Sequence, residues 1–252
     1  MRNIQTIGII IGKRNFGEHD QFANIFSPDL GKIDAVAKGA RKISGSFIGH
    51  LETLNICKLQ LYKSTRGYTI TECRLEHGFT KIRNSLELSI MAFLLLEIFN
   101  KITHTQEQSA QLFSLLTNTL NGLEENQNTD LYAGAFKVKI LNMSGALPDI
   151  SRCGNCNHRW TEKNIINLTN EGNIFCQECD NQSTGNNLTS KTIIEFSTMK
   201  LIHFLINSNQ KQIQKIKISK SETANFKIII DIFLHNYLPL ELKSEKISAS
   251  LK

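Results

Sequence analysis

Four of the six cysteines in the chain form two Cys-x-x-Cys pairs. Cys153 and Cys156 make the first pair and, after nineteen intervening residues, Cys176 and Cys179 make the second. Two such pairs at this separation are typical of a zinc site with four thiolate ligands. Because four thiolates complete a tetrahedral coordination sphere, the pattern predicts one structural Zn²⁺ without an open position for water or a substrate.

Two other uses of these cysteines are two disulfide bonds or a redox-active Cys-x-x-Cys pair. The segment that begins at Met1 lacks the features of a secretory signal peptide, so we expect a cytoplasmic protein in a reducing compartment. Structural disulfides are rare there, and a redox-active pair normally occurs alone. Zinc is therefore the preferred interpretation. Cys57 and Cys73 lie in strand-like segments, and we interpret them as small buried hydrophobic residues.

Turn-forming residues stand where a metal-binding hairpin needs them. Gly154 and Asn155 suit positive φ values within the first pair, and Gly172–Asn173 suits the tip of a hairpin between the pairs. Apolar side chains in this segment are expected to form a small core over the metal, namely Trp160, Ile165, Ile166 and Leu168.

A second candidate site is cationic. Lys38, Arg41 and Lys42 fall within five residues after a strand-like segment, and Lys13 and Arg14 follow the first strand-like segment. Lysine and arginine on a flexible backbone can follow the phosphates of a nucleic acid strand. We expect DNA contact at these five residues.

Neighbouring residues fit the same interpretation. Gly39 and Ser44–Ser46 supply backbone flexibility, and Phe16 or Phe47 could stack on an unpaired base. The alternative is a solvated hairpin tip whose charges only maintain solubility.

The formal net charge of +6 is unevenly distributed. Residues 1–80 carry 11 Lys and Arg against 7 Asp and Glu, and residues 188–252 carry 10 against 5. Residues 81–150 carry 5 against 7, and residues 151–187 carry 3 against 4. Basic ends around an acidic middle indicate contact with a polyanion at particular faces. The alternative is a lysine-rich composition that reflects genome bias, and a moderately basic isoelectric point alone carries little weight.

The first 78 residues have the pattern of a small β-barrel. Five short segments with β-branched and alternating residues are separated by turn signals, and no long helical pattern interrupts them. These segments are residues 6–12, 21–27, 32–38, 54–62 and 68–73. The pattern predicts a five-stranded OB-fold, although an SH3-like barrel would give a similar pattern.

The remainder has helical periodicity around the cysteine segment. We expect helices over residues 85–99, 105–120, 130–143, 191–208 and 221–238, with Thr129 or Asp130 as the cap of the third. The predicted fold class is α+β, an N-terminal five-stranded OB-fold β-barrel followed by an α-helical domain with an inserted four-cysteine zinc element. Its predicted parts are residues 1–80 (barrel), 81–150 (first helical part), 151–187 (zinc element) and 188–252 (second helical part). No apolar run is long enough to cross a bilayer.

The sequence offers no catalytic constellation. His19 lies between Glu18 and Asp20, but no nucleophile motif or phosphate-binding glycine loop accompanies this trio. A Gly17-Glu18-x-Asp20 sequence that enters a strand is typical of a hydrogen-bonded turn. We therefore expect a binding protein and not an enzyme.

The chain resembles the RecO family of recombination mediators over its whole length. The residues that carry the resemblance are Gly17-Glu18-His19-Asp20, residues 26–32 (FSPDLGK), residues 37–42 (AKGARK), Leu95-Leu96-Glu97, and Phe136 through Gly145 and Pro148 into the cysteine pairs. The Lys-Gly-Ala-Arg run between two strands is the most specific of them. The order of barrel, helices, cysteine element and helices is also similar.

This resemblance implies an OB-fold and a protein that binds single- and double-stranded DNA and anneals complementary strands. It implies that the protein works with RecR to load RecA onto DNA coated by single-stranded-DNA-binding protein. DNA contact carries over to Lys38, Arg41 and Lys42. Docking of the acidic, hydrophobic tail of the single-stranded-DNA-binding protein is matched by region only, to Phe136, Lys137, Lys139 and Leu141. Some relatives lack the four cysteines, which implies that zinc stabilises the fold without being required by the mechanism.

Two other functional classes share parts of this pattern. A zinc-containing OB-fold RNA-binding or ribosome-associated protein would have the same barrel and charge. A hydrolytic enzyme would need a metal with an open coordination position, which four thiolate ligands do not leave.

Overall fold

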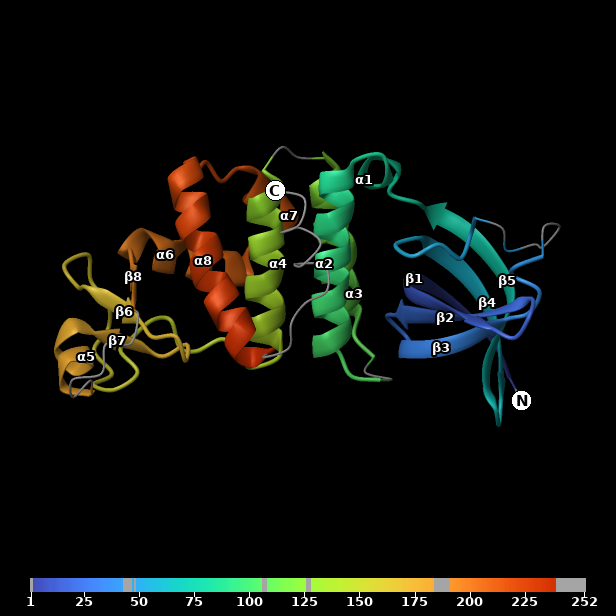
Figure 1. Ribbon diagram of the computed structural model, residues 1–252, viewed down its shortest axis with the longest axis horizontal. Coiled ribbons are helices and arrows are strands. Elements are labelled where there is room, and N and C mark those ends of the chain that lie inside the picture. The colour runs from blue at the N-terminus through green and yellow to red at the C-terminus, as the bar shows by residue number, and fades with distance from the viewer. Residues whose placement is uncertain are drawn as a thin grey trace. The chain divides into compact units, whose positions relative to one another are not determined.

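The computed structural model describes residues 2–42, 47, 49–105, 108–125, 128–183 and 191–238. Contacts divide the chain into two compact units, Met1–Glu124 and Glu125–Lys252. Figure 1 shows a β-barrel at the N-terminal end of the chain and helices with a small sheet in the C-terminal unit. The expected α+β class, with a barrel followed by helices and a cysteine cluster, is confirmed.

Five strands form a closed barrel in the order β1-β2-β3-β5-β4. The strands are β1 (Arg2–Phe16), β2 (Asp20–Ser27), β3 (Gly31–Ala37), β4 (Ile56–Ser64) and β5 (Gly67–His77). Neighbouring strands run antiparallel except β3 and β5, which pair in parallel through Ala35–Tyr68 and Val36–Thr69. This arrangement confirms the predicted OB-fold.

Alternation along the strands builds the barrel core. In β3, Ile33, Ala35 and Ala37 are buried while Asp34 is exposed, as the period of two requires. Cys57 is fully buried in this core and Cys73 packs against it, in accordance with their interpretation as small hydrophobic residues. Phe47 is also part of the core.

Three helices complete the first unit, α1 (Thr80–Arg83), α2 (Leu86–Ile102) and α3 (Ala110–Glu125). Ser85 caps α2 as an acceptor from the Leu88 amide. The helix expected from residue 105 begins at Ala110, because the Ser109 hydroxyl accepts the Leu112 N–H and caps the helix there. The predicted start was therefore too early.

The carboxyl end of α2 is joined to the barrel. The Lys32 ammonium donates to the carbonyl oxygens of Asn100 at 2.7 Å and Thr103 at 2.8 Å, where helical carbonyls lack intrahelical partners. Partial burial lowers the pKa of Lys32, although Asp34 opposes this effect. Phe26 of β2 meets Phe99 of α2 edge to face, with ring centroids 4.8 Å apart. One lysine of the barrel is therefore a structural cation.

The second unit contains α4 (Thr129–Met143), α6 (Phe196–Asn207), α7 (Gln210–Gln214) and α8 (Lys220–Tyr237). The cap of α4 is Asn128, whose side chain accepts the Leu131 N–H, and not Thr129 or Asp130. Gly145 follows the end of α4 with a φ of 71°, a value that glycine adopts without strain.

Helices α4 and α8 pack at very close range. A Cβ built on Gly134 of α4 would overlap Cε1 of the Phe226 ring on α8 and lie 2.9 Å from its Cζ, so only glycine fits there without a shift. Next to this contact, the buried Lys137 ammonium pairs with Asp231 of α8 at 2.6 Å.

A small sheet of order β7-β6-β8 carries the cysteine segment. It consists of β6 (Ile166–Leu168), β7 (Ile174–Cys176) and β8 (Thr192–Ile194), with α5 (Gln177–Ser183) after β7. The prediction that residue 191 begins a helix was wrong. Strand β8 pairs with β6, and three β-branched residues in succession favour this extended conformation. The helix begins at Phe196.

Among the helices in the described part of the chain, none combines the length and apolar character that crossing a membrane requires.

The contacts group α1–α3 with the barrel, whereas the sequence predicted a boundary at residue 80. The segments 1–80, 81–150, 151–187 and 188–252 stay a prediction about separately folding parts.

The close contact of α4 with α8 generates the first prediction. Gly134→Ala is expected to lower the free energy of unfolding by about 1–3 kcal/mol through overpacking against Phe226. Without the clash, the higher helix propensity of alanine would stabilise the protein by about 1 kcal/mol. A gain of stability in urea unfolding would therefore contradict the prediction. In the Phe226→Leu background the same change is expected to cost less, because the ring that causes the clash is gone.

Candidate metal centre and nucleic-acid interface

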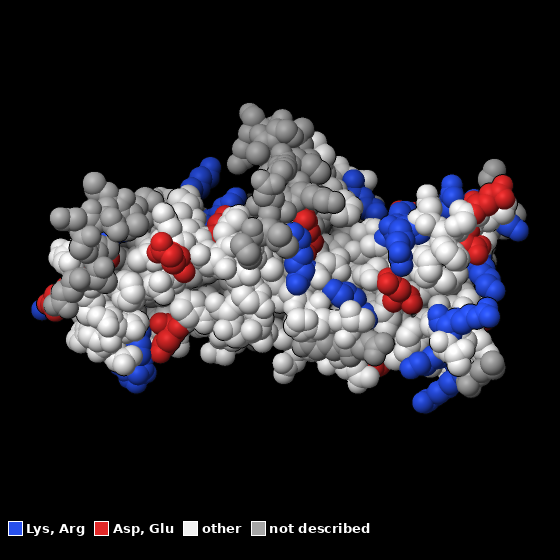
Figure 2. All heavy atoms as spheres, turned by 60° about the horizontal axis from the view of Figure 1, so that its bottom comes forward, with Lys and Arg blue, Asp and Glu red and all other residues white. Residues whose placement is uncertain are grey.

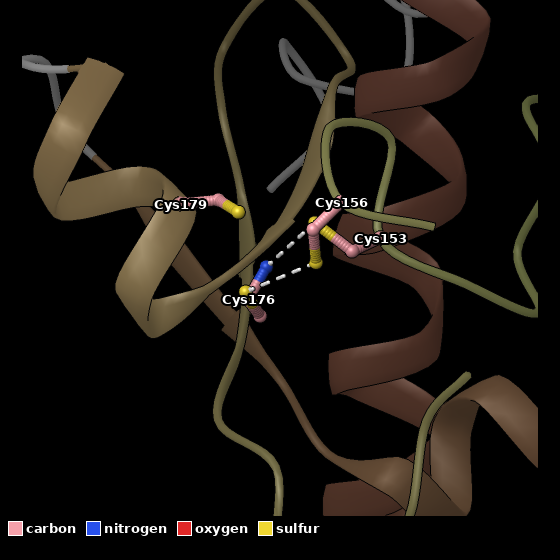
Figure 3. A group of neighbouring side chains, drawn as sticks. All are labelled: Cys153, Cys156, Cys176 and Cys179. Atoms are coloured by element: carbon pink, nitrogen blue, oxygen red, sulfur yellow. Dashed lines mark hydrogen bonds between the residues drawn. The ribbon is translucent and has the colours of Figure 1, made fainter. Parts of the chain in front are cut away.

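The four Sγ atoms of Cys153, Cys156, Cys176 and Cys179 all lie within 4.8 Å of one another. Figure 3 shows them converging from the loop of the first pair, from the end of β7 and from α5. The Sγ atoms of Cys156 and Cys176 are 3.9 Å apart. A tetrahedron with Zn–S bonds of about 2.3 Å has S–S edges of about 3.8 Å, whereas a disulfide bond measures about 2.0 Å. The cysteine cluster could therefore hold a metal ion, and none of its four cysteines is in a disulfide bond.

Backbone hydrogen bonds hold the first cysteine pair in place. The Gly154 N–H donates to the Ile174 carbonyl at 2.9 Å and joins this turn to β7. The Cys176 N–H points at Cys153 Sγ, at 3.3 Å. The left-handed residue of the turn is Asn157, with a φ of 58°, and not Gly154 or Asn155 as the sequence analysis expected.

The ionisation of the cluster is uneven. Burial alone would raise the pKa of the Cys153 thiol. Hydrogen bonds from the backbone N–H groups of Cys156, Cys176 and Asn155 outweigh this effect and lower the pKa to about 6. The neighbouring Cys176 thiol raises the pKa of Cys179 to about 12, with burial adding to the effect. Thiols with such different pKa values do not all ionise together near neutral pH, and a bound cation would favour the thiolate form of all four. This donor set fits a thiophilic divalent metal.

The apolar residues near the cluster are placed largely as expected. Trp160, Ile166 and Leu168 are buried, but Ile165 is 44% exposed and does not contribute to the core. The predicted turn at Gly172 is present, with a φ of 82° at this glycine.

A buried ionic group fixes α5 over the sheet. The Asp180 carboxylate of α5 accepts hydrogen bonds from Asn167 of β6 at 3.0 Å and from Lys191 at 2.8 Å. Since Cys179 precedes Asp180, this interaction also positions the second cysteine pair.

The cationic segment Lys38–Lys42 lies on the surface of the barrel. Lys38, Arg41 and Lys42 are exposed, and Figure 2 shows Lys and Arg side chains gathered over the barrel at the right of the view. Ser44–Ser46, which the sequence analysis expected to supply flexibility, lie outside the described residues.

The turn between β1 and β2 holds this cationic segment. Asp20 accepts the Gly39 N–H at 2.8 Å, and the Arg41 N–H donates to the His19 carbonyl at 3.0 Å. The Arg41 guanidinium donates to the Glu18 carbonyl at 3.1 Å. The trio around His19 therefore forms a hydrogen-bonded turn, as the sequence predicted. Its contacts with Gly39 and Arg41, which the sequence did not predict, position the cationic segment.

Lys13 and Arg14 extend the surface but have partners of their own. The Lys13 ammonium pairs with Glu52 at 2.5 Å. The Arg14 guanidinium lies 4.4 Å from the centroid of the Phe22 ring and 3.9 Å from the Asp34 carboxylate. These two side chains are less available to phosphates than those of the cationic segment.

The predicted stacking residue Phe16 pairs with Phe22, an aromatic residue beside Arg14 that the sequence analysis missed. Phe16, 49% exposed, meets the Phe22 ring edge to face with centroids 4.6 Å apart. Phe22 was detectable from its register, because it lies opposite Arg14 across β1 and β2. Phe47, the other predicted stacking residue, is buried in the barrel core and has no surface for a base.

A hollow of about 390 Å³ adjoins this aromatic pair. Its lining combines cationic, amide, carboxylate and aromatic side chains, among them Lys13, Arg14, Phe22, Asn24 and Asp34. Such a mixture can hydrogen-bond the edge of a base and also contact its face.

The four residues matched by region to tail docking have structural partners. Phe136 and Leu141 are fully buried, and Lys137 is paired with Asp231. The Lys139 ammonium donates to the Ser208 carbonyl at the end of α6, and burial lowers its pKa. In this conformation Phe136 and Leu141 contact the core of the unit, and tail docking at this group stays a prediction.

Comparisons with known proteins match most of the chain. The family model "Recombination protein O N terminal" matches residues 1–79, and "Recombination protein O C terminal" matches residues 83–246. A DNA repair protein RecO of Dehalococcoides mccartyi is 29% identical over 243 residues, covering 96% of this chain and 93% of the relative. A DNA repair protein RecO of Thermoanaerobacter is 26% identical over 246 residues, covering 97% and 96%.

The geometry of the cysteine cluster generates the second prediction. The purified protein is expected to contain one divalent metal ion per chain, and Cys176→Ser is expected to lose most of it. Loss of a thiolate should lower the thermal midpoint by about 5 °C or more, since metal binding contributes to folding free energy. Elemental analysis and thermal unfolding measure both effects. Cys73→Ser, outside the cluster, is the control, and full metal content in Cys176→Ser would contradict the prediction.

Proposed function

The chain belongs to the RecO family of DNA repair and recombination proteins, and from this premise we propose that it anneals complementary DNA strands. We propose further that, with RecR, it helps to load RecA onto DNA coated by single-stranded-DNA-binding protein. The observation that supports direct DNA contact is the exposed cationic segment Lys38–Lys42, held on the barrel by Asp20 and by the His19 carbonyl.

The segment suits phosphates because of how its charges are presented. Lys38 and Lys42 are exposed point charges, and the Arg41 backbone is fixed while its side chain is exposed. No ion pair involving these three side chains is formed among the described residues. Ordering of the backbone before binding reduces the entropy lost when phosphates are contacted.

The aromatic pair Phe16 and Phe22 gives the same surface a preference for single strands. An unpaired base exposes its face, and stacking on an aromatic ring stabilises it by about 1–3 kcal/mol. A duplex buries its base faces, so it can use only the cations. This difference supports binding of both DNA forms with single strands favoured.

The mechanism needs no bond chemistry. Two complementary strands repel each other through their phosphates, and a cationic surface that neutralises both lowers this repulsion during their encounter. Counterion release makes the binding weaken steeply with salt. We accordingly propose a binding protein and not an enzyme.

We propose that the metal of the cysteine cluster is zinc. A zinc ion with four thiolate ligands has no open coordination position and stabilises the surrounding fold. The cluster joins the first cysteine turn, β7 and α5, whose strands of three residues could form only a small core of their own. The barrel cations lie outside this element, so the DNA contacts should not need zinc directly.

Partner binding is proposed from family membership. RecR and the acidic tail of the single-stranded-DNA-binding protein are the expected partners, with the protein acting in the cytoplasm. Tail docking on the coated DNA would raise the local concentration of the barrel at its substrate. Lys137 and Lys139, matched by region only, remain the candidate docking cations.

The third prediction tests the cationic segment. Arg41→Glu combined with Lys42→Glu is expected to weaken DNA binding at moderate salt by about tenfold or more and to slow annealing in proportion. Each lost phosphate contact should reduce the slope of log affinity against log salt by about 0.7 for single strands. Fluorescence anisotropy over a salt series measures the slope.

The matched control is Arg74→Glu combined with Lys81→Glu, which changes the net charge equally at exposed residues of β5 and α1. Equal weakening by both variants would show a general charge effect and remove the segment from the interface. A strong preference for unpaired RNA over DNA in competition would favour an RNA-binding function instead.

The fourth prediction concerns stacking. Phe16→Leu is expected to weaken single-strand binding about fivefold or more while duplex affinity changes less than about twofold, because leucine keeps the apolar volume but loses the ring. Phe93→Leu, at a 43% exposed phenylalanine of α2, is the control. Parallel losses for single strands and duplexes would argue against base stacking at Phe16.

A further inference from the structure

A run of unpaired lysines lies in the second unit. Lys211 on α7, Lys215 and Lys217 in the connection, and Lys220 at the start of α8 are all exposed. We call residues 209–220 the lysine segment; it contains no Asp or Glu. None of its four lysines forms an ion pair with a residue that the structure describes.

Other lysines of this unit are used differently. Four of them are bound to carboxylates, namely Lys137 to Asp231, Lys191 to Asp180, Lys200 to Glu162 and Lys227 to Asp130. A solvated face of a lysine-rich protein usually interleaves both signs of charge. The lysine segment therefore departs from the pattern of its own unit.

The backbone of the lysine segment is well fixed. Asn209 and Gln212 form a reciprocal capping box at the start of α7, and Ser219 and Glu222 form another at the start of α8. Ile213 is buried and anchors α7 to the unit.

The first acid after the segment is engaged at its own helix terminus. The Glu222 carboxylate accepts the Ser219 N–H at 2.7 Å. The backbone thus holds the four lysines in an ordered arrangement. No carboxylate of a described residue pairs with their ammonium groups.

We propose that the lysine segment binds the sugar-phosphate backbone of a second DNA strand while the barrel holds the first. This inference rests on the proposed annealing function and assigns it a second contact surface. Annealing requires two polyanions to be neutralised together. Residues 1–80 and residues 188–252 are basic. Residues 81–187, which separate them, carry 8 Lys and Arg against 11 Asp and Glu, so the excess of cations forms two groups along the chain.

The composition of the lysine segment favours phosphates over an acidic peptide. An acidic, hydrophobic peptide would need an apolar anchor site beside the cations. The exposed large hydrophobic residues nearest in sequence are Phe204 and Ile228, and none of those described lies between them. Lysines without a neighbouring aromatic ring contact phosphates as point charges and read no base.

The test compares Lys215→Glu/Lys217→Glu with the control Lys200→Glu/Lys227→Glu, which changes the net charge equally at lysines that already have partners. Two non-complementary oligothymidine strands, one carrying a donor dye and one an acceptor dye, report simultaneous capture by energy transfer. The lysine-segment variant is expected to bind one strand within about twofold of the native affinity and to lose about tenfold in simultaneous capture and annealing. Circular dichroism confirms that each variant is folded.

Native levels of simultaneous capture in the lysine-segment variant, or an equal loss in the control, would overturn the inference. The inference would also be overturned if the lysine-segment variant no longer bound a labelled peptide containing Asp and Phe but still captured the second strand. That result would assign the surface to an acidic peptide. Arg41→Glu/Lys42→Glu is measured in parallel. The barrel proposal fails if this variant binds the first strand normally, whereas the present inference fails if the residual DNA binding of this variant is unaffected by adding Lys215→Glu/Lys217→Glu.

Discussion

The parallel pairing of β3 with β5 closes the barrel, and the proposed interface depends on this closure. Because β5 occupies the edge of β3, the chain that leaves Ala37 cannot form a hairpin with β4 and has to cross to it. The crossing places Phe47 and Leu51 in the barrel core and leaves Lys38, Arg41 and Lys42 outside. The turn from β1 to β2 then fixes the start of the crossing through Asp20 and the His19 carbonyl.

The cysteine cluster solves a different physical problem. Strands of three residues and a seven-residue helix bury too little apolar surface to be stable alone. Coordination of a metal by four thiolates would supply the missing free energy without enlarging the core. The hydrogen bonds of the buried Asp180 carboxylate with Asn167 and Lys191 add a polar restraint on the same element.

Lysine serves three purposes in this molecule. Lys32 and Lys139 donate to carbonyl oxygens at helix ends, and burial lowers the pKa of both. Lys137 neutralises a carboxylate within the second unit. The cationic segment and the lysine segment present their charges to solvent. A count of charges therefore overstates the cations available to a polyanion, and the surfaces that matter are those where the cations are exposed and form no ion pair with a described carboxylate.

The sequence by itself determined the elements whose signals are local. Alternation of residues predicted the strands of the barrel, cysteine spacing predicted the cluster, and the Lys38–Lys42 run after β3 predicted the cationic segment. The tertiary structure decided what depends on residues distant in the chain. The open edge of β6 made a strand of Thr192–Ile194, and packing made Phe47 a core residue. Folding also gave Lys137 an ion-pair partner in Asp231, 94 residues away. The Phe22 ring contacts the Arg14 guanidinium because β1 and β2 pair in the register that sets these two residues opposite each other. Local periodicity encodes the conformation of a segment, but burial and charge pairing depend on which partner folding brings near, and that information is not local.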